Sequence, residues 1–131
     1  MLVETLELKL LVWSVGLTIL QMLVAVVGAM TQVGLPALAG NREGLPHLTG
    51  WAGRANRAHF NMLESLVLFA VLVVAASVVG KINATTALGA ELFFWGRVAY
   101  APIYIIGIPW LRTAAWAVSL IGLVLIFTQL L

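Results

Sequence analysis

Hydrophobic positions dominate four long stretches of the chain, and each stretch is bounded by polar residues or by glycine and proline. The stretches are residues 8–33, 56–79, 85–108 and 113–130. A helix rises about 1.5 Å per residue, so each stretch is long enough to cross about 30 Å of hydrocarbon. The pattern therefore predicts four transmembrane helices within a single domain over residues 1–131.

The connections between these stretches predict how the helices are arranged. Residues 34–53, GLPALAGNREGLPHLTGWAG, contain repeated glycine and proline, which is typical of a surface loop and not of a helix. The connections 80–84 and 107–112 are short, and short connections place consecutive helices antiparallel. The expected fold class is thus an all-α membrane protein, an up-down-up-down bundle of four transmembrane helices. Residues 1–9 lack the basic start of a secretory signal, so 8–33 is interpreted as the first transmembrane helix.

Composition supports the membrane assignment and narrows the chemistry. Hydrophobic residues make up 63% of the chain and charged residues only 9%, with a mean hydropathy of +1.09, which is outside the range of soluble domains. The chain has no cysteine, so disulfides, protein thiolates and sulfur-based metal sites are excluded. A net charge of +2 indicates loop topology and no nucleic-acid partner.

The distribution of positive charge predicts the orientation in the membrane. Four arginines lie in the first loop, at its exit and in the third connection: Arg42, Arg54, Arg57 and Arg112. Only Lys9 and Lys81 lie near the opposite ends of the predicted helices. Because positive residues close to transmembrane ends prefer the cytoplasm, we expect the long loop and the 109–112 turn on the cytoplasmic side and both termini outside.

Two of the predicted helices carry a stripe of polar residues. The stripe on 56–79 has i, i+4, i+7 spacing and consists of Arg57, Asn61 and Glu64. The stripe on 85–108 has i, i+3, i+7 spacing and consists of Arg97, Tyr100 and Tyr104. Each spacing places its members on one helix face. At about 1.5 Å per residue from the cytoplasmic edge, Glu64 lies roughly 10 Å deep and Arg97 roughly 16 Å deep, so the two stripes overlap in depth.

Charged groups inside the hydrocarbon layer need partners, because each costs several kcal/mol when unpaired. Pairing of Glu64 with Arg97 is the expected solution. One interpretation stops at an ion pair that fixes the helix register. The other is a polar pocket that opens to the cytoplasm, since the two stripes supply more donors and acceptors than a register device needs. His59 is expected to be a helix-surface histidine solvated by headgroups.

Two sequence motifs resemble those of a known family. RAHFNMLES begins at Arg57 and runs into an apolar helix, and GRVAYAPIY spans residues 96–104, with Arg112 and Thr113 shortly afterwards. From about Arg54 to the C-terminus, this pattern resembles the MAPEG family, the membrane-associated proteins in eicosanoid and glutathione metabolism. The resemblance implies a homotrimer of four-helix subunits that binds glutathione in cytoplasm-facing clefts between subunits.

The resemblance also implies roles for individual residues. Contacts to glutathione are expected from Arg57, Asn61, Glu64, Arg97, Tyr100 and Tyr104. Arg112 corresponds to an arginine that stabilises the thiolate, with a one-residue shift in the alignment, and it is the expected catalytic residue. Three positions depart from the pattern of the catalytic eicosanoid members: Phe60, Met62 and Tyr100. The end of the first helix, TQVGLPALAG, also lacks their basic cluster.

The expected function is a membrane-bound, glutathione-dependent transferase or peroxidase that acts on lipophilic electrophiles or lipid hydroperoxides. The expected location is a bacterial inner membrane, with the lipid bilayer and a lipophilic small molecule as partners. A non-catalytic lipid-binding or scaffold member of the same fold is one alternative. A small proton-coupled exporter is another, although it requires an unpaired membrane acid.

Overall fold

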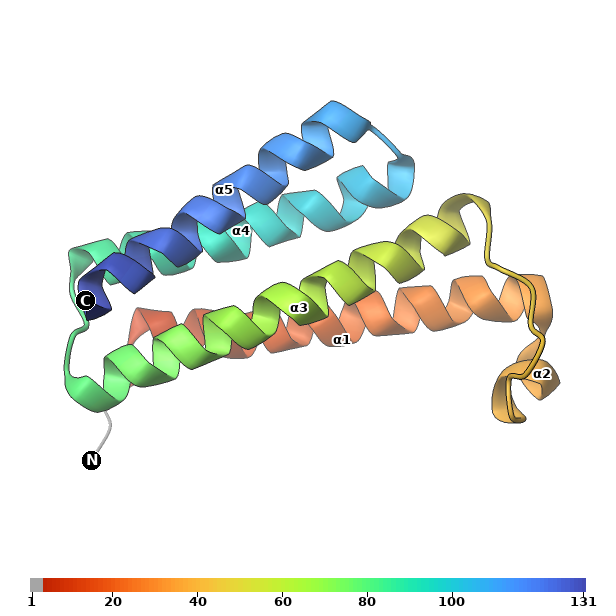
Figure 1. The fold of residues 1–131 in the computed structure, drawn as a ribbon, viewed down its shortest axis with the longest axis horizontal. Helices are drawn as coiled ribbons and strands as arrows, with labels where there is room; N and C mark the ends of the chain where they lie inside the picture. The colour runs from red at the N-terminus through yellow and green to blue at the C-terminus, as the bar shows by residue number, and fades with distance from the viewer. Residues whose placement is uncertain (1–3) are drawn as a thin grey trace.

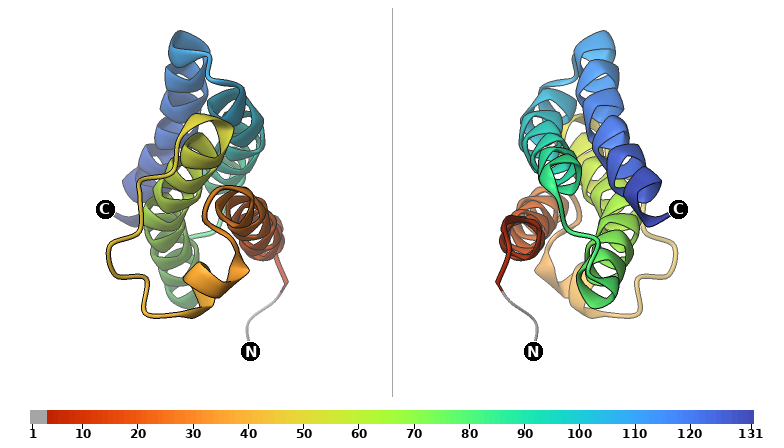
Figure 2. Two further views of the ribbon diagram at one scale, coloured as in Figure 1. Left: turned by 90° about the vertical axis from the view of Figure 1, so that its right-hand side faces the viewer. Right: turned by 90° about the vertical axis from the view of Figure 1, so that its left-hand side faces the viewer.

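The computed structural model describes residues 4–131, and the regular structure of this part is helical. The helices are α1 (Leu6–Val33), α2 (Leu35–Ala39), α3 (Gly50–Val79), α4 (Ala84–Ile106) and α5 (Pro109–Leu130). The four long helices lie roughly alongside one another, and each runs opposite to the one before it (Figure 1). The end-on views show α4 and α5 as one closely packed pair, with α1 and α3 beside it (Figure 2).

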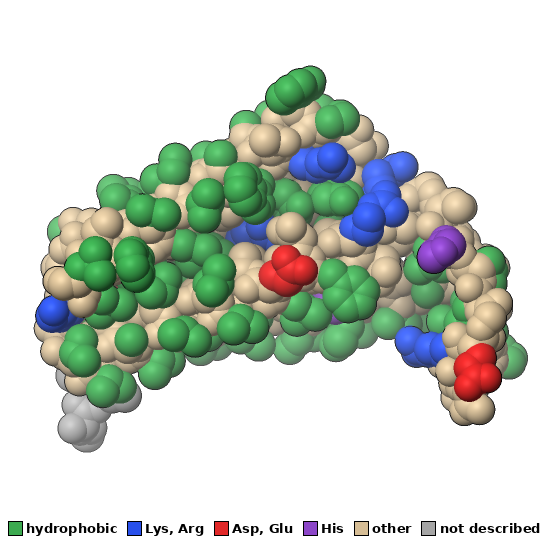
Figure 3. All heavy atoms as spheres, in the orientation of Figure 1, with side chains coloured by type: hydrophobic (Ala, Val, Ile, Leu, Met, Phe, Trp, Pro, Cys, Tyr) green, Lys and Arg blue, Asp and Glu red, His purple; other side chains and the backbone are tan. Residues whose placement is uncertain are grey.

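Three of the described helices, α1, α3 and α5, are long and apolar enough to cross a membrane. The fourth long helix, α4, which contains Glu91 and Arg97, is not among these three. One face of the molecule is covered mostly by hydrophobic side chains, while Lys and Arg gather toward the end where α3 and α5 begin (Figure 3). Such a surface suits lipid along the helices and polar headgroups at their ends, as in an integral membrane protein.

The segment 34–53 is not wholly a loop, so that prediction was wrong in part. It contains the short helix α2, which has a proline in its first turn, where the missing N–H leaves no hydrogen bond unmade. Helix α3 begins at Gly50 rather than near residue 56. The first turn of α3 packs closely on α1 at Gly28, where an added Cβ would lie only 2.9 Å from Cβ of Ala52. Ala52 is fully buried by this contact, which explains why the helix begins before residue 56.

The end of the bundle opposite the arginines is fastened by polar contacts between α1 and α4. Asn83 and Thr86 form a reciprocal cap at the start of α4. The Thr86 hydroxyl also donates to Oε2 of Glu7, at 2.9 Å. Glu7 is buried, so this contact satisfies a carboxylate oxygen that would otherwise be costly inside the bundle.

Glycines allow α4 and α5 to approach at backbone distance. A Cβ added to Gly122 would contact the carbonyl oxygen of Gly89 and lie 2.7 Å from the backbone nitrogen of Phe93. About two turns further along α4 from Gly89, a Cβ on Gly96 would lie 3.0 Å from the backbone nitrogen of Ser119. Small residues at helix crossings are the usual means of close packing in membranes. The fixed α4–α5 pair is the frame against which α3 positions its polar stripe.

We predict that Gly122→Ala destabilises the protein by about 1–3 kcal/mol, because the new methyl group meets backbone atoms that cannot rotate away. Gly16→Ala is the matched control, since a Cβ there has nothing within 4 Å and alanine favours the helix by up to about 1 kcal/mol. The free energy of unfolding is measured in detergent, with tryptophan fluorescence as the signal that monitors unfolding. Equal stability of the two variants would contradict the assigned α4–α5 contact.

Candidate functional site

The arginine-rich end of the bundle is shaped by a contact between α3 and the last turn of α4. Arg54 Nε donates to the carbonyl oxygen of Ile105 at 2.7 Å. The last carbonyls of a helix have no partner within it, so Arg54 satisfies one of them. Gly107 follows with a φ of 94°, a left-handed value that favours glycine and ends α4. The chain then reverses into α5, which brings Arg112 back toward α3.

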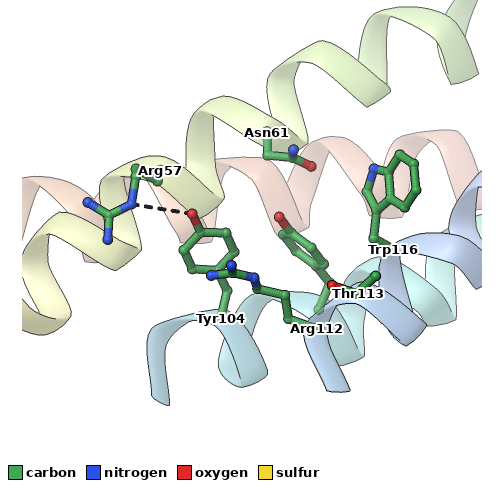
Figure 4. Close-up of a pocket in the computed structure, with 7 residues that line it drawn as sticks. Arg57, Asn61, Tyr104, Arg112, Thr113 and Trp116 are labelled. Carbon is green, nitrogen blue, oxygen red and sulfur yellow. Dashed lines mark hydrogen bonds between the residues drawn. The ribbon is translucent and has the colours of Figure 1, made fainter. Parts of the chain in front are cut away.

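A cavity of about 290 Å³ lies between α3, α4 and α5 at this end. Its lining residues are Arg57, Asn61, Tyr100, Tyr104, Arg112, Thr113 and Trp116. In Figure 4, Arg57 from α3 points toward the hydroxyl of Tyr104 from α4, and Arg112 from α5 lies against the Tyr104 ring. Asn61 from α3 and Trp116 from α5 lie further along the same space. Five of the seven residues singled out in the sequence therefore line one cavity.

Tyrosine rings and guanidinium groups are interleaved along the cavity wall. Arg57 Nε donates to the Tyr104 hydroxyl at 3.3 Å, and the Arg112 guanidinium lies 4.5 Å from the centre of the Tyr104 ring. The rings of Tyr104 and Tyr100 meet edge to face at 5.5 Å. On the inner side, the Arg97 guanidinium lies 4.2 Å from the centre of the Tyr100 ring. These cation–π contacts hold the cationic groups in fixed positions.

The cavity carries uncompensated positive charge. Within residues 4–131, the one ion pair joins Lys9 to Glu4, so neither Arg57 nor Arg112 forms an ion pair with a carboxylate. Guanidinium groups beside tyrosine hydroxyls suit carboxylate ligands, which accept charge-assisted hydrogen bonds, often two from one arginine. The cavity is therefore suited to a small anionic molecule.

Arg97 does not line this cavity, although it is central to the site. It is only 1% exposed, and its Nη2 donates to Oδ1 of Asn61 at 2.8 Å. Asn61 in turn lines the cavity. Arg97 thus lies behind the cavity wall and contacts two residues of its lining, Asn61 and Tyr100.

The expected ion pair between Glu64 and Arg97 is not present. Glu64 is exposed and lies one turn beyond Asn61 on α3, while Arg97 is buried beside Asn61. The neutral amide satisfies a donor of Arg97 without drawing a carboxylate out of its polar surroundings, which would cost several kcal/mol. Glu64 lies on the same face of α3 as Asn61, but Asn61 takes the hydrogen bond of Arg97 and Glu64 lines the space between α3 and α5.

Glu64 lines a second cavity of about 210 Å³ between α3 and α5. Asn61 and Trp116 line both cavities, so the two spaces are neighbours on the same side of the bundle. The second cavity also has apolar walls from α3 and α5, formed by Leu68, Leu120 and Leu123. A polar compartment with cations thus adjoins one with a single carboxylate and apolar walls.

His59 is not the solvated surface residue that the sequence predicted. It is 9% exposed and lines a groove of about 440 Å³ between α1, α2 and α3, on the opposite side of α3 from the cavities. The prediction failed because the packing of α1 against α3 covers this side of α3, and the neighbours of a polar helix residue cannot be read from its position in the sequence alone.

Sequence reasoning did not select Trp116, Thr113 or Arg54 as site residues. Trp116 and Thr113 could have been found from spacing, since Arg112, Thr113 and Trp116 occupy neighbouring positions near one face of the first turns of α5. The role of Arg54 had no such signal. It depends on where α4 ends and on which carbonyl is left free there.

The fold and this cleft define a small integral membrane protein of long antiparallel helices, with a cationic, tyrosine-lined cavity at one end. The sequence pattern of the MAPEG family matches residues 9–131. The chain belongs to this family. No curated protein and no solved structure matches it. Family membership associates the protein in general terms with glutathione or eicosanoid metabolism at membranes.

We predict that Asn61→Leu lowers the free energy of unfolding by about 1.5–3 kcal/mol, because it removes the acceptor of a buried, charged donor. The double variant Asn61→Leu/Arg97→Met should recover part of this loss, since it also removes the unpaired charge. Asn56→Leu on the same helix is the control, because no hydrogen bond of its side chain is seen in residues 4–131. The free energy of unfolding in detergent is measured for each single variant, the double variant and the control. If the double variant lost at least as much stability as the two single changes added together, the bond between Arg97 and Asn61 would not be stabilising.

Proposed function

We propose that this protein is a glutathione-dependent transferase or peroxidase that acts on lipophilic electrophiles or lipid hydroperoxides. The observation that carries the proposal is the cavity in which Arg57 and Arg112 stand beside two tyrosines without an ion pair to a carboxylate. Glutathione has two carboxylates, an ammonium group and a thiol, so it needs cations and an acid in one site. Membership of the MAPEG family supports glutathione as the thiol.

The binding roles follow from the position of each side chain. Arg57, with the Tyr104 hydroxyl beside it, holds a carboxylate of the tripeptide. Asn61, oriented by Arg97, hydrogen-bonds to a peptide group or a second carboxylate. Glu64, in the adjoining cavity, receives the ammonium group. Tyr100 closes the inner wall.

The 290 Å³ of the first cavity is at the lower end of the range of about 300–1,000 Å³ for small-molecule sites, so the ligand extends into the second cavity.

Arg112 is assigned the catalytic role. A cation close to sulfur lowers the pKa of a thiol and raises the fraction of nucleophilic thiolate. In the transferase reaction, the thiolate forms a C–S bond with the electrophilic carbon, and the leaving group departs with its electron pair. In the peroxidase reaction, two glutathione molecules are oxidised to the disulfide while the hydroperoxide is reduced to an alcohol and water. The apolar wall of the second cavity offers a lipophile a place beside the sulfur.

The membrane setting proposed here includes α4 as a fourth span. Its Arg97 is buried within the bundle, and α1, α3 and α5, on either side of it in the chain, are apolar enough to span alone. The arginine-rich end faces the cytoplasm, in accord with the positive-inside rule, in a bacterial inner membrane. Both cavities open at the surface of the single chain. Neighbouring copies in a homotrimer, the arrangement implied by the family, would close them.

One observation favours a non-catalytic lipid-binding or scaffold member of the same fold. The 440 Å³ groove between α1, α2 and α3 is lined mainly by apolar side chains and exceeds either cavity in volume. A proton-coupled exporter requires an unpaired acid in the membrane, and Glu64 forms no ion pair. Family membership nevertheless favours the glutathione chemistry. Glutathione binding separates these alternatives.

We predict that calorimetry detects glutathione binding to the detergent-purified protein, and that Arg57→Ala and Glu64→Gln each weaken the Kd about 10- to 100-fold. The reason is that each removes a hydrogen bond to a charged group, worth about 1.5–3 kcal/mol. Lys81→Ala, which removes a charge at the opposite end of the bundle, should leave the Kd unchanged. Absence of binding to a well-folded wild-type protein would support the lipid-binding alternative.

A second prediction concerns the thiolate. Arg112→Ala should shift the alkaline rise of the pH–rate profile for conjugation to higher pH, because loss of a nearby cation raises the pKa of the bound thiol. A shift of one unit would lower the rate about tenfold at a pH well below that pKa. Arg42→Ala, a cation outside both cavities, is the control. An unchanged profile with a lower kcat would assign Arg112 a role other than stabilising the thiolate.

A further inference from the structure

The groove between α1, α2 and α3 is separate from the two cavities of the candidate site. Its volume of about 440 Å³ lies within the range of about 300–1,000 Å³ for small-molecule sites. Among the described residues, none lines both this groove and either cavity. Helix α2, which forms one wall of the groove, lies beside the end of α1 (Figure 1). A ligand of the groove is therefore distinct from a ligand of the cavities.

The α2 side of the groove carries a positive charge. Arg42 follows α2, and its Nε donates to the carbonyl oxygen of Leu38 at 2.7 Å, which holds the guanidinium at the groove wall. Arg42 forms no ion pair within residues 4–131. Glu43, its neighbour in the chain, does not line the groove, and none of the described lining residues is acidic. An arginine without an acidic neighbour in the groove suits a phosphate or carboxylate group.

The α3 wall adds two polar side chains. Asn56 and His59 both line the groove, and their i, i+3 spacing places them on one helix face, about 4.5 Å apart along the axis. His59 is 9% exposed, and its Nδ1 has no partner within residues 4–131. Buried polar atoms in folded proteins are nearly always hydrogen-bonded. An unsatisfied ring nitrogen in this wall therefore points to a partner that enters the groove.

The remaining walls are apolar and reach the outer surface of the bundle. Met22 and Val26 of α1 and Phe60 of α3 line the groove and are 43%, 45% and 55% exposed. Counted from the contact of Gly28 with Ala52, Met22 lies six residues and Phe60 eight residues further from the arginine-rich end, a rise of about 9–12 Å. This inner end of the groove therefore opens onto apolar surface that faces lipid in the membrane setting proposed above.

An anionic glycerophospholipid has its chemical groups in the same order as the groove. Its phosphate suits Arg42 and the amide of Asn56, because charged and N–H donors bind phosphate oxygens. An ester carbonyl, a short distance along the molecule, suits the His59 ring. An acyl chain suits the apolar inner end and continues from it into the bilayer. A free inorganic anion would leave the apolar walls uncovered, and an uncharged lipid would leave Arg42 unpaired, so neither matches the whole groove.

We propose that this groove binds the headgroup and the first part of one acyl chain of an anionic glycerophospholipid from the surrounding leaflet. Arg42 and Asn56 bind the phosphate, His59 binds an ester group, and Met22 and Phe60 contact the chain. The lipid is a bound component of the protein and not a substrate, and it fastens α2 to α1 and α3. The proposal does not rest on the glutathione chemistry, because the groove and the cavities share no described residue.

The first test measures which lipid binds, in the absence of glutathione. Native mass spectrometry of the full chain compares dioleoyl phosphatidylglycerol with dioleoyl phosphatidylcholine, whose ammonium group offsets its phosphate. We expect one phosphatidylglycerol per chain, bound about 5- to 10-fold more tightly, since one arginine near an anionic lipid contributes on this scale. Arg42→Gln should abolish the preference, and Lys81→Gln, at the opposite end of the bundle, should retain it. No preference in the folded wild type, or equal loss in both variants, would overturn the proposal.

The second test locates the lipid. Phosphatidylglycerol with a diazirine in the first half of one acyl chain is photo-crosslinked to the full chain in liposomes, and the labelled peptides are identified by mass spectrometry. We expect labelling concentrated in residues 22–29 and at Phe60. Ala39→Trp, which fills the groove from an exposed position on α2, should reduce this labelling. Ala114→Trp, an exposed alanine outside the groove, is the matched control and should not.

Two results of the second test would contradict the proposal. Labelling spread evenly over the apolar surface, and unchanged in Ala39→Trp, would mean that the groove holds no lipid of its own. A second copy of the chain lying on the groove would be captured by a photo-crosslinking amino acid placed at position 39, and residues 22–29 would then remain unlabelled. That result would assign the groove to a contact between copies.

Discussion

The buried guanidinium of Arg97 and its hydrogen bond to Asn61 hold the site together. A cation in a low-dielectric interior must have its donors satisfied, and Arg97 meets part of this need with Asn61 Oδ1 and the face of Tyr100. Tyr100 packs edge to face on Tyr104. Tyr104 in turn accepts from Arg57 and lies under Arg112. A continuous series of contacts therefore runs from the centre of the bundle to the mouth of the cavity.

The cavities lie where they do because the helix pairs pack unequally. Glycines bring α4 and α5 to backbone contact, and this pair is the most closely packed in the molecule. Between α3 and α5 the side chains are larger, with Trp116 among them, and the packing is more open. Arg54 ties the start of α3 to the end of α4, so the opening between α3 and α5 has a fixed mouth. The rigid pair and this contact, together with the hydrogen bonds of Arg57 to Tyr104 and of Arg97 to Asn61, set the width of the cleft.

Helical spacing was sufficient to predict most of the cavity, because residues at i, i+3, i+4 and i+7 share a face whatever the neighbouring helix is. It could not predict which side of α3 faces which partner. The ion pair of Glu64 with Arg97 was inferred from depth, and depth says nothing about rotation about the helix axis. The start of α3 was placed too late for a related reason. The contact of Ala52 with Gly28 extends the helix through glycines that local propensity would leave in a loop.

Phe60, Met62 and Tyr100, the three positions that depart from the pattern expected of the catalytic eicosanoid members, have different surroundings in this structure. Met62 is fully buried in the hydrophobic core, where an acid would require different packing, so its lack of charge reflects the core and not the cleft. Tyr100 is buried over Arg97 and still contributes a polar group to the cavity wall. Phe60 alone is well exposed, and it lines the groove beside His59. Of the three positions, Phe60 is therefore the one whose side chain alters an exposed surface, and that surface is the groove side of α3.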